Sequence, residues 1–202
     1  TSAGGGLTLA TLLRAVYGEV CAIDQLGVAR RRASVTNLLR AGRGVRCAGW
    51  CETPYDVLIA LEETESLRHL DRIGPHTLVL LADIRVDTIA GYSSAPLPGH
   101  AAVRSTLAAH GASVLQLPVT RELQHHRLGG AHGTALFFGA FAALLGHTAA
   151  EAERVAPAPG ASGSGAMLAV RGHATAIAAG LHGWLHGTPH RHAARAYAPA
   201  AA

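Results

Sequence analysis

Short apolar runs alternate with helix-like patterns along most of the chain. An uninterrupted apolar run bounded by polar or glycine residues is typical of a strand that is covered on both faces. We expect a strand of this kind at residues 56–60, and four further strands at residues 20–23, 34–39, 78–81 and 113–117. Pro118 directly follows the last of these runs and would end it, since proline cannot donate to a sheet ladder.

Between these runs, apolar residues recur at helical spacing. Helices are expected at residues 7–16, 62–72, 101–110, 131–145, 149–155 and 167–181. The segment 62–72 has acidic residues at its start and arginines toward its end, which suits the helix dipole. Gly111 stands where a helix C-terminus favours glycine.

Alternation of strands and helices predicts a three-layer α/β fold with a mostly parallel sheet of about five strands flanked by helices. We expect one domain over residues 1–155, followed by a linker-like stretch at 156–165 that is rich in Pro, Gly, Ser and Ala. A C-terminal helix packing on the domain is expected at 166–185, and a flexible tail at 186–202. We find no internal repeat.

Composition is typical of a globular protein, with 49% apolar and 15% charged residues in a chain of 202. All 17 basic residues are arginine, and the formal net charge is +4. Aromatic residues make up 4% and are not interleaved with the arginines, so the footprint of a nucleic-acid-binding surface is missing and we expect no nucleic-acid partner.

The three cysteines leave one without a partner in any pairing, which favours a reducing compartment (Cys21, Cys47, Cys51). The longest apolar stretch, residues 134–146, is shorter than the roughly 20 residues that cross a membrane. We therefore expect a cytoplasmic protein that does not insert into a membrane.

Two segments carry the residue types of an anion site. The glycine run Gly4, Gly5 and Gly6 precedes a helical pattern, where free backbone N–H groups can cradle a phosphate. Residues 27–35 contain consecutive arginines, which can bind phosphate or carboxylate bidentately. A flexible chain start and a solvated charge run explain the same residues, and both interpretations stay open at this point.

The run Tyr-Asp-Val-Leu-Ile-Ala-Leu-Glu-Glu-Thr-Glu-Ser-Leu-Arg at residues 55–68 resembles the "aDvLlalE…Ealr" stretch of the gamma subunit, or gamma-type domain, of 2-oxoacid:ferredoxin oxidoreductases. Weaker matches follow in the family's order and cover about residues 1–155, with a fainter match at 167–180. The start resembles the family's GxGGQG loop, residues 27–35 resemble its hGMaQRGGsV segment, and residues 130–139 its "G…aNmvmLGa" helix. The matching residues are Gly4, Gly6, Gly27, Ala29, Arg31, Ser34, Val35, Gly139 and Ala140.

The chain departs from the family pattern at several of its motif positions. Gly5 stands where the family has glutamine, Leu26 where it has histidine, and Thr134 where asparagine is common. The other departures are Ala3, Arg30, Arg32 and Ala33. These changes identify a divergent member, whose ligand contacts need not be the standard ones.

The resemblance implies a subunit of an enzyme that oxidatively decarboxylates a 2-oxoacid with coenzyme A, forming an acyl-CoA and reducing ferredoxin. It is nearest the indolepyruvate type, which implies an arylpyruvate-like substrate. Thiamine diphosphate and iron–sulfur clusters would belong to a partner chain or domain, because this chain has no thiamine-diphosphate motif and fewer than the four thiolates that a cluster needs. The matched positions imply that the phosphates of coenzyme A contact Gly4, Gly5, Gly6, Arg31 and Ser34. No catalytic residue and no metal site are expected in this chain.

Two other functions fit the same residues. An independent Rossmann-like oxidoreductase would use the glycine run for a nucleotide, with Asp24 after the strand 20–23 as the ribose-binding acid. A purely structural partner subunit would have lost any ligand site. We interpret the acidic residues Glu62, Glu63 and Glu65 as a helix N-terminus and His125-His126 as a surface turn. The late histidines are interpreted as incidental to the tail, since nearby glycines and a proline disfavour a helix there (His182, His186, His190, His192).

Overall fold

The computed structural model describes residues 3–26, 35–48, 53–86, 97–155 and 163–187. Helices and strands alternate through much of this part of the chain. The helices, with η marking the 3-10 type, are α1 (Ala3–Tyr17), η1 (Thr64–Arg72), α2 (His100–Ala109), α3 (Val119–His125), η2 (Gly130–His132), α4 (Thr134–Leu144), α5 (Ala149–Val155), α6 (Ser164–Ala178) and α7 (Trp184–Gly187). The strands are β1 (Val20–Leu26), β2 (Val35–Ala41), β3 (Val57–Ala60), β4 (Leu78–Ala82) and β5 (Ser113–Leu117).

The centre of the molecule is a parallel sheet in the order β3-β4-β5, in which Leu80 lies opposite Ile59 and Leu115. Every residue of β4 is buried. Successive side chains of a strand point to opposite faces, so β4 feeds two cores. Leu78, Leu80 and Ala82 join the larger cluster with α1 and α4, whereas Val79 and Leu81 pack with α2.

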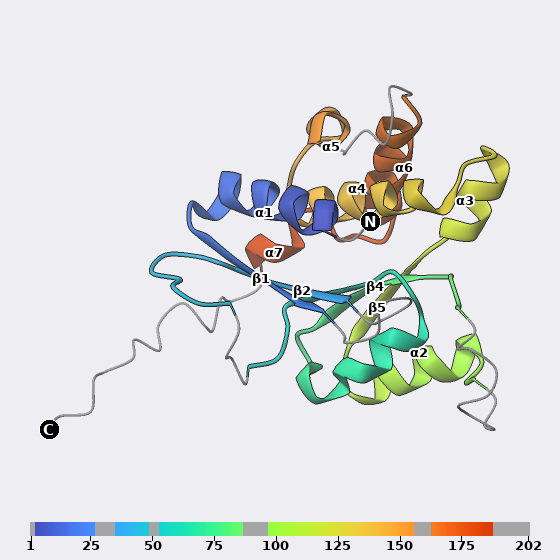
Figure 1. Cartoon of the computed structure of the whole chain (residues 1–202), viewed down its shortest axis with the longest axis horizontal. Coiled ribbons are helices and arrows are strands. Elements are labelled where there is room, and N and C mark those ends of the chain that lie inside the picture. Colours follow the sequence, from blue (N-terminus) through green and yellow to red (C-terminus); the bar gives the residue numbers. More distant parts are fainter. Residues whose placement is uncertain (1–2, 27–34, 49–52, 87–96, 156–162, 188–202) are drawn as a thin grey trace, which may run out of the picture.

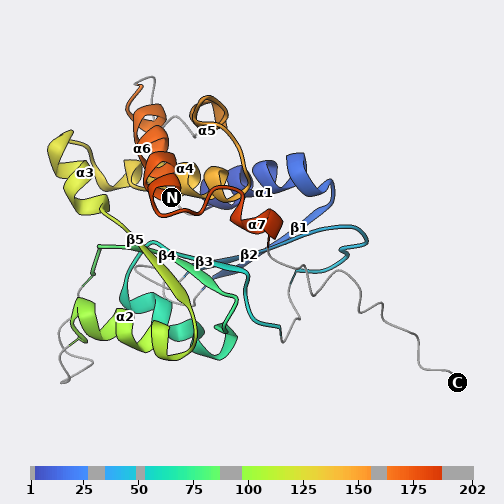
Figure 2. The ribbon, with the colours of Figure 1, turned by 180° about the vertical axis from the view of Figure 1, so that it is seen from behind.

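These two cores separate three layers. Figure 1 shows α1, α4, α5, α6 and α7 above the strands and α2 below them, and the reverse view in Figure 2 shows the same division. Helix η1 lies beside α2 on the lower face, where Val103 and Leu107 of α2 are buried. The expected α/β fold with strands between two helical layers is therefore confirmed.

Strands β1 and β2 form a separate antiparallel pair, with Ile23 opposite Leu38. The expectation of five strands in one mostly parallel sheet was wrong in this respect, because two of the five make their own sheet. Only one face of the pair packs on the main core, through Val20, Leu39 and Ala41. Ile23 is exposed, so this run is not the buried strand that its apolar residues suggested.

The upper layer depends on a close crossing of α4 and α6. Every residue of α4 from Ala135 to Leu144 is buried, as expected for a helix that is apolar on all sides. A Cβ added to Gly139 would lie 1.7 Å from the carbonyl oxygen of Ala169, and one added to Gly172 would lie 1.9 Å from that of Leu136. Each helix therefore presents a glycine to the backbone of the other, and only glycine fits there.

Several expected boundaries differ from the observed ones. Helix α4 begins at Thr134 and not at residue 131, because the glycine-rich segment before it forms the short η2. Helix α6 begins at Ser164, inside the expected linker, and α7 includes His186 and Gly187 of the expected tail. Helix α3 was not foreseen at all. No helix in the described ranges combines the length and apolar character needed to cross a bilayer.

Candidate functional site

The carboxyl ends of the three parallel strands meet at one edge of the central sheet, and acidic residues follow two of them. Glu62 and Glu63 come after β3, and Asp83 follows β4. In open α/β sheets this edge is where ligands usually bind, because the loops after the strands converge there. The acidic residues of this edge are therefore candidates for a binding site.

Among these acidic residues, Glu63 is unusual because its carboxylate is fully buried, with a side chain that is 0% exposed. Its Oε2 contacts the Nδ1 of His100 at the start of α2, and lies 3.3 Å from an Nη of Arg85 after β4. The other oxygen, Oε1, and the Nε of Arg85 are both buried, and neither has a hydrogen-bond partner among the described residues. Three elements thus converge on one buried carboxylate whose hydrogen-bonding capacity is only partly used.

The neighbouring carboxylates have a structural role. Glu62 accepts hydrogen bonds from the Thr64 hydroxyl at 2.8 Å, from the Glu65 N–H at 2.7 Å and from the Val86 N–H at 3.2 Å. Asp83 accepts from the Thr120 N–H at 2.8 Å. These hydrogen bonds connect the segments that follow β3, β4 and β5. By accepting from the Glu65 N–H, Glu62 also fulfils the role expected of a residue at a helix N-terminus.

Glu63 also lies at a helix start, as the N-cap residue of η1, but its side chain makes no capping hydrogen bond. It is instead enclosed and paired with two side chains distant in sequence, which the sequence did not predict. His100 itself is 53% exposed, and its Nε2 has no partner among the described residues. A carboxylate that holds Nδ1 fixes the orientation and tautomer of an imidazole and leaves Nε2 free for chemistry.

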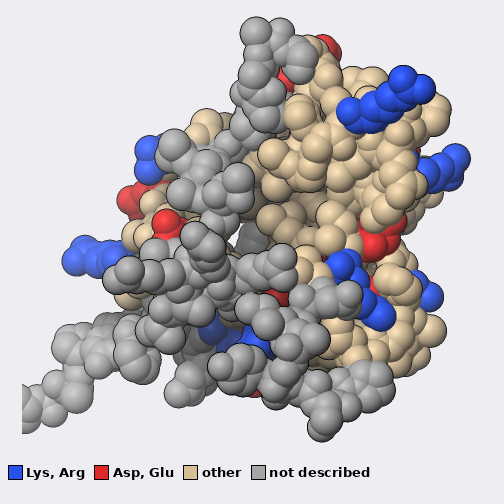
Figure 3. Space-filling view, turned by 45° about the vertical axis from the view of Figure 1, so that its right-hand side comes forward, with Lys and Arg blue, Asp and Glu red and all other residues tan. Residues whose placement is uncertain are grey.

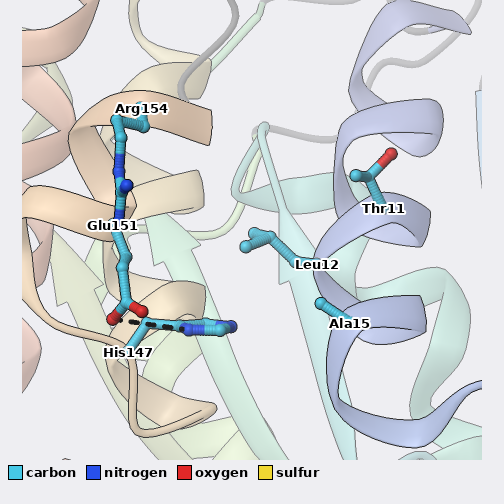
Figure 4. Close-up of a pocket in the computed structure, with 6 residues that line it drawn as sticks. All are labelled: Thr11, Leu12, Ala15, His147, Glu151 and Arg154. Carbon is cyan, nitrogen blue, oxygen red and sulfur yellow. Dashed lines mark ion pairs between the residues drawn. The ribbon is translucent and has the colours of Figure 1, made fainter.

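A second feature is a pocket of about 200 Å³ between α1 and the start of α5. Figure 4 shows Leu12 and Ala15 of α1 facing His147, with the ion pair between His147 and Glu151 beside them. The Glu151 carboxylate lies 3.7 Å from Nδ1 of His147 and accepts from the Thr148 N–H at 2.7 Å. The bonds from Thr148 lower the pKa of Glu151 below its ordinary value. Because Glu151 completes the N-cap of α5, we interpret this feature as structural.

The expected phosphate-binding residues are only partly described. Gly4, Gly5 and Gly6 lie in the first turn of α1 and not in a loop before it. The helix therefore starts earlier than the expected residue 7. Because the first N–H groups of a helix have no partner within it, this turn still has the donors that the loop was expected to supply. In both ribbon views the start of α1 lies on the side of the carboxyl ends of the parallel strands (Figures 1 and 2). Arg31 and Ser34 lie outside the described residues.

Two of the described histidines serve the packing of the helices. Among the described residues, no group of three His, Cys, Asp or Glu side chains could hold a metal ion. His186 was expected to be an incidental tail residue, but its Nε2 lies 2.7 Å from the Leu145 carbonyl oxygen and docks α7 on the end of α4. His173 makes the same kind of contact with the His147 carbonyl oxygen, also at 2.7 Å. These histidines therefore satisfy carbonyl groups just beyond the end of α4.

Charges on the face that includes the carboxyl edge are mixed. Figure 3 shows basic and acidic side chains interspersed over its described part, and neither sign forms a continuous patch there. A ligand at this edge would consequently be recognised by individual groups such as the His100 imidazole and not by a broad field.

Comparison with known proteins gives a fold and no family. No protein-family model matches the sequence, and no curated protein matches it. Among solved structures, the chain is similar to a 2-oxoglutarate:ferredoxin oxidoreductase from Magnetococcus marinus with 2-oxoglutarate, coenzyme A and succinyl-CoA bound. The TM-score is 0.58 at 14% identity, and the similarity covers 87% of this chain and 28% of that one. The likeness establishes that the two share a fold over most of this chain.

Proposed function

We propose that this chain is the small, cluster-free subunit or domain of a thiamine-diphosphate-dependent 2-oxoacid:ferredoxin oxidoreductase. The observation that carries the proposal is the shared fold with part of an enzyme of this class, which runs through most of the chain. The sequence resemblance to the gamma type supports it independently, since it runs in the family's order over the same part of the chain. Because the shared region is about a quarter of the neighbour's length, a larger partner would complete the enzyme.

Its own contribution would be to shape the coenzyme A side of the active site. The solved neighbour was determined with coenzyme A and succinyl-CoA bound. In the present chain the first turn of α1 offers free N–H donors at Gly4, Gly5 and Gly6 for a phosphate. Arg31 and Ser34 complete the proposed set of phosphate contacts. An arylpyruvate, indolepyruvate-like substrate is proposed from the sequence resemblance.

The partner would hold the cofactors. Three cysteines in the whole chain are fewer than the four thiolates of one iron–sulfur cluster. Thiamine diphosphate would supply the chemistry that breaks the bond to the substrate carboxylate. The described residues of this chain would position coenzyme A and brace that partner.

The Rossmann-like alternative fits the structure less well. A Rossmann unit places the strand after its first helix parallel to its neighbour. Here β1 follows α1 and pairs antiparallel with β2. Asp24 lies inside β1, where it accepts a hydrogen bond from Asn37 of β2, and does not end a parallel strand.

The test is to isolate the chain from its native cells and identify by mass spectrometry what accompanies it. We expect an equimolar partner that carries thiamine diphosphate and iron–sulfur clusters, and coenzyme A-dependent oxidation of an arylpyruvate by the complex. A chain isolated alone as a stable monomer or homodimer would refute the proposal. In the complex, Arg31→Ala should weaken the apparent affinity for coenzyme A; an unchanged affinity would favour a purely structural subunit.

A further inference from the structure

Glu63, Arg85 and His100 form a cluster that stability alone does not explain. Removing a carboxylate from water is costly, and the cost is recovered only if its oxygens are fully paired. In this cluster one oxygen of Glu63 and the Nε of Arg85 are buried without a hydrogen-bond partner. If these contacts served only to join β3, β4 and α2, apolar residues could do so at a lower cost in desolvation free energy.

The half-exposed member of the cluster has the geometry of a proton acceptor. His100 directs Nδ1 to the buried Glu63 carboxylate, while its ring is 53% exposed and Nε2 has no partner in the described part of the chain. In the neutral imidazole this contact places the hydrogen on Nδ1 and the lone pair on Nε2. Arg85 contacts the same carboxylate oxygen, which holds the Glu63 side chain in place beside His100.

The location of the cluster indicates a ligand. His100 begins α2 beside the carboxyl edge of the parallel sheet, the edge at which α/β proteins bind their ligands. In the ribbon views the glycine-containing start of α1 lies on the same side of the molecule (Figures 1 and 2). The edge therefore offers the His100 imidazole from the helical layer below the strands and the first N–H groups of α1 from the layer above them.

We propose that His100 accepts the proton of the coenzyme A thiol and that Glu63 is its positioning residue. The identity of the thiol rests on the proposed function. Nε2 of His100 forms a bond to the thiol hydrogen, and the S–H bond breaks with its electron pair left on sulfur. The products are a thiolate and an imidazolium, which the Glu63 carboxylate stabilises without taking the proton. The imidazolium then returns its extra proton to water.

The test measures the thiolate directly on the full chain mixed with coenzyme A. At pH 7 a thiol with a pKa of about 8.5 is only about 3% ionised, so a proton acceptor can raise the thiolate fraction by tenfold or more. We expect the wild-type chain to increase the rate of coenzyme A alkylation by iodoacetamide about tenfold, as measured by mass spectrometry of the alkylated coenzyme. The ultraviolet absorbance of the thiolate should rise in parallel, and this second readout needs no access for a reagent.

Matched variants assign the effect to residues. His100→Gln should abolish the increase, and Glu63→Gln should reduce it several-fold while the dissociation constant for coenzyme A stays unchanged. His110→Gln is the control, because His110 is an exposed histidine at the other end of α2. Thermal unfolding of each variant verifies that it is folded; since His100 is half exposed, its variant keeps the test valid even if the Glu63 variant unfolds.

The outcomes separate the two proposals. If coenzyme A binds but its thiol ionises no more than in free solution, or if His100→Gln retains the increase, the inference about His100 fails and the proposed function stands. If neither the chain nor its assembled complex binds coenzyme A, the coenzyme A role of the proposed function fails and the inference fails with it.

Discussion

The α4–α6 crossing and the Glu63 carboxylate are both buried, but the crossing is apolar whereas the surroundings of Glu63 are polar. At the crossing, two glycines let two backbones approach, and the helix α4 is buried on every side without a charged residue. In the cluster, a fully buried carboxylate faces an arginine and a histidine and still leaves polar atoms unpaired. The first arrangement gains stability from close packing, whereas the second loses some of it to desolvation. The comparison separates a region that stabilises the fold from one whose polar groups are not explained by stability.

The largest effect is expected at the crossing. Gly139→Ala would place a methyl group 1.7 Å from the Ala169 carbonyl oxygen, so α4 and α6 must separate. We expect a loss of about 3 kcal/mol in the free energy of unfolding, measured by urea denaturation. Gly129→Ala is the matched control, because a Cβ there meets nothing within 4 Å, and it should be nearly neutral. Equal stabilities of the two variants would mean that the helices do not touch at Gly139.

The cluster should respond differently to single and double changes. Arg85→Met removes the arginine partner of the buried Glu63 carboxylate and leaves the His100 contact, and it should cost about 2 kcal/mol. Adding Glu63→Leu removes the buried charge and should restore most of the lost stability. At the α4–α6 crossing, by contrast, we expect no second substitution to recover the stability lost in Gly139→Ala. Urea denaturation of both variants measures this recovery. A double variant less stable than Arg85→Met would show that the cluster stabilises the fold after all.

A smaller effect is expected at the surface of the helical layer. Thr148 precedes α5 and exchanges hydrogen bonds with Glu151, and Thr148→Ala should cost about 1 kcal/mol. The pKa of Glu151 lies below its ordinary value of 4.5, so its contribution is present above that pH and is lost as the pH falls through the lowered value. The difference between wild type and variant should therefore shrink between pH 7 and pH 3 in thermal unfolding. A pH-independent difference would exclude the Glu151 part of the cap.

The smallest effect is expected in the pH dependence of stability, at His69 in the helical layer of η1 and α2. Burial lowers the pKa of His69 in η1 below its ordinary value of 6.5, against the opposing influence of Asp71. The neutral ring is favoured in the folded state, so its contribution is complete above pH 6.5 and is lost as the pH falls through the lowered value. His69→Gln should remove this part of the acid sensitivity, seen as a flatter stability profile between pH 7.5 and pH 5. An unchanged profile would mean that His69 titrates alike in the folded and unfolded chain.

Local pattern was enough to predict the elements of the central sheet. Strand β5 and helix α5 have the expected bounds, because Pro118 ends the first and a compact polar–apolar repeat defines the second. The division into two sheets could not be predicted, since strand direction depends on pairing between β1 and β2 and not on either run alone. The partial exposure of Ile23 follows from that pairing.

The cluster around Glu63 was missed for a related reason. Glu63 stands between two residues with ordinary roles at a helix start, and its partners lie 22 and 37 residues further along the chain. No spacing rule connects such positions. Gly139 and Gly172 did carry a local signal, because a glycine inside an apolar helical run usually marks a close approach of two backbones.

The buried helix α4 has a consequence for synthesis of the protein. Helix α6 begins 20 residues after the last residue of α4, at Ser164 compared with Leu144. A ribosome adds about 5 to 20 residues per second, so α4 spends seconds as nascent chain before its covering helix exists. During that time the face of α4 that later meets Ala169 and Gly172 lacks its partner helix. We expect truncation of the chain before Ser164 to leave residues 134–144 uncovered and prone to aggregate.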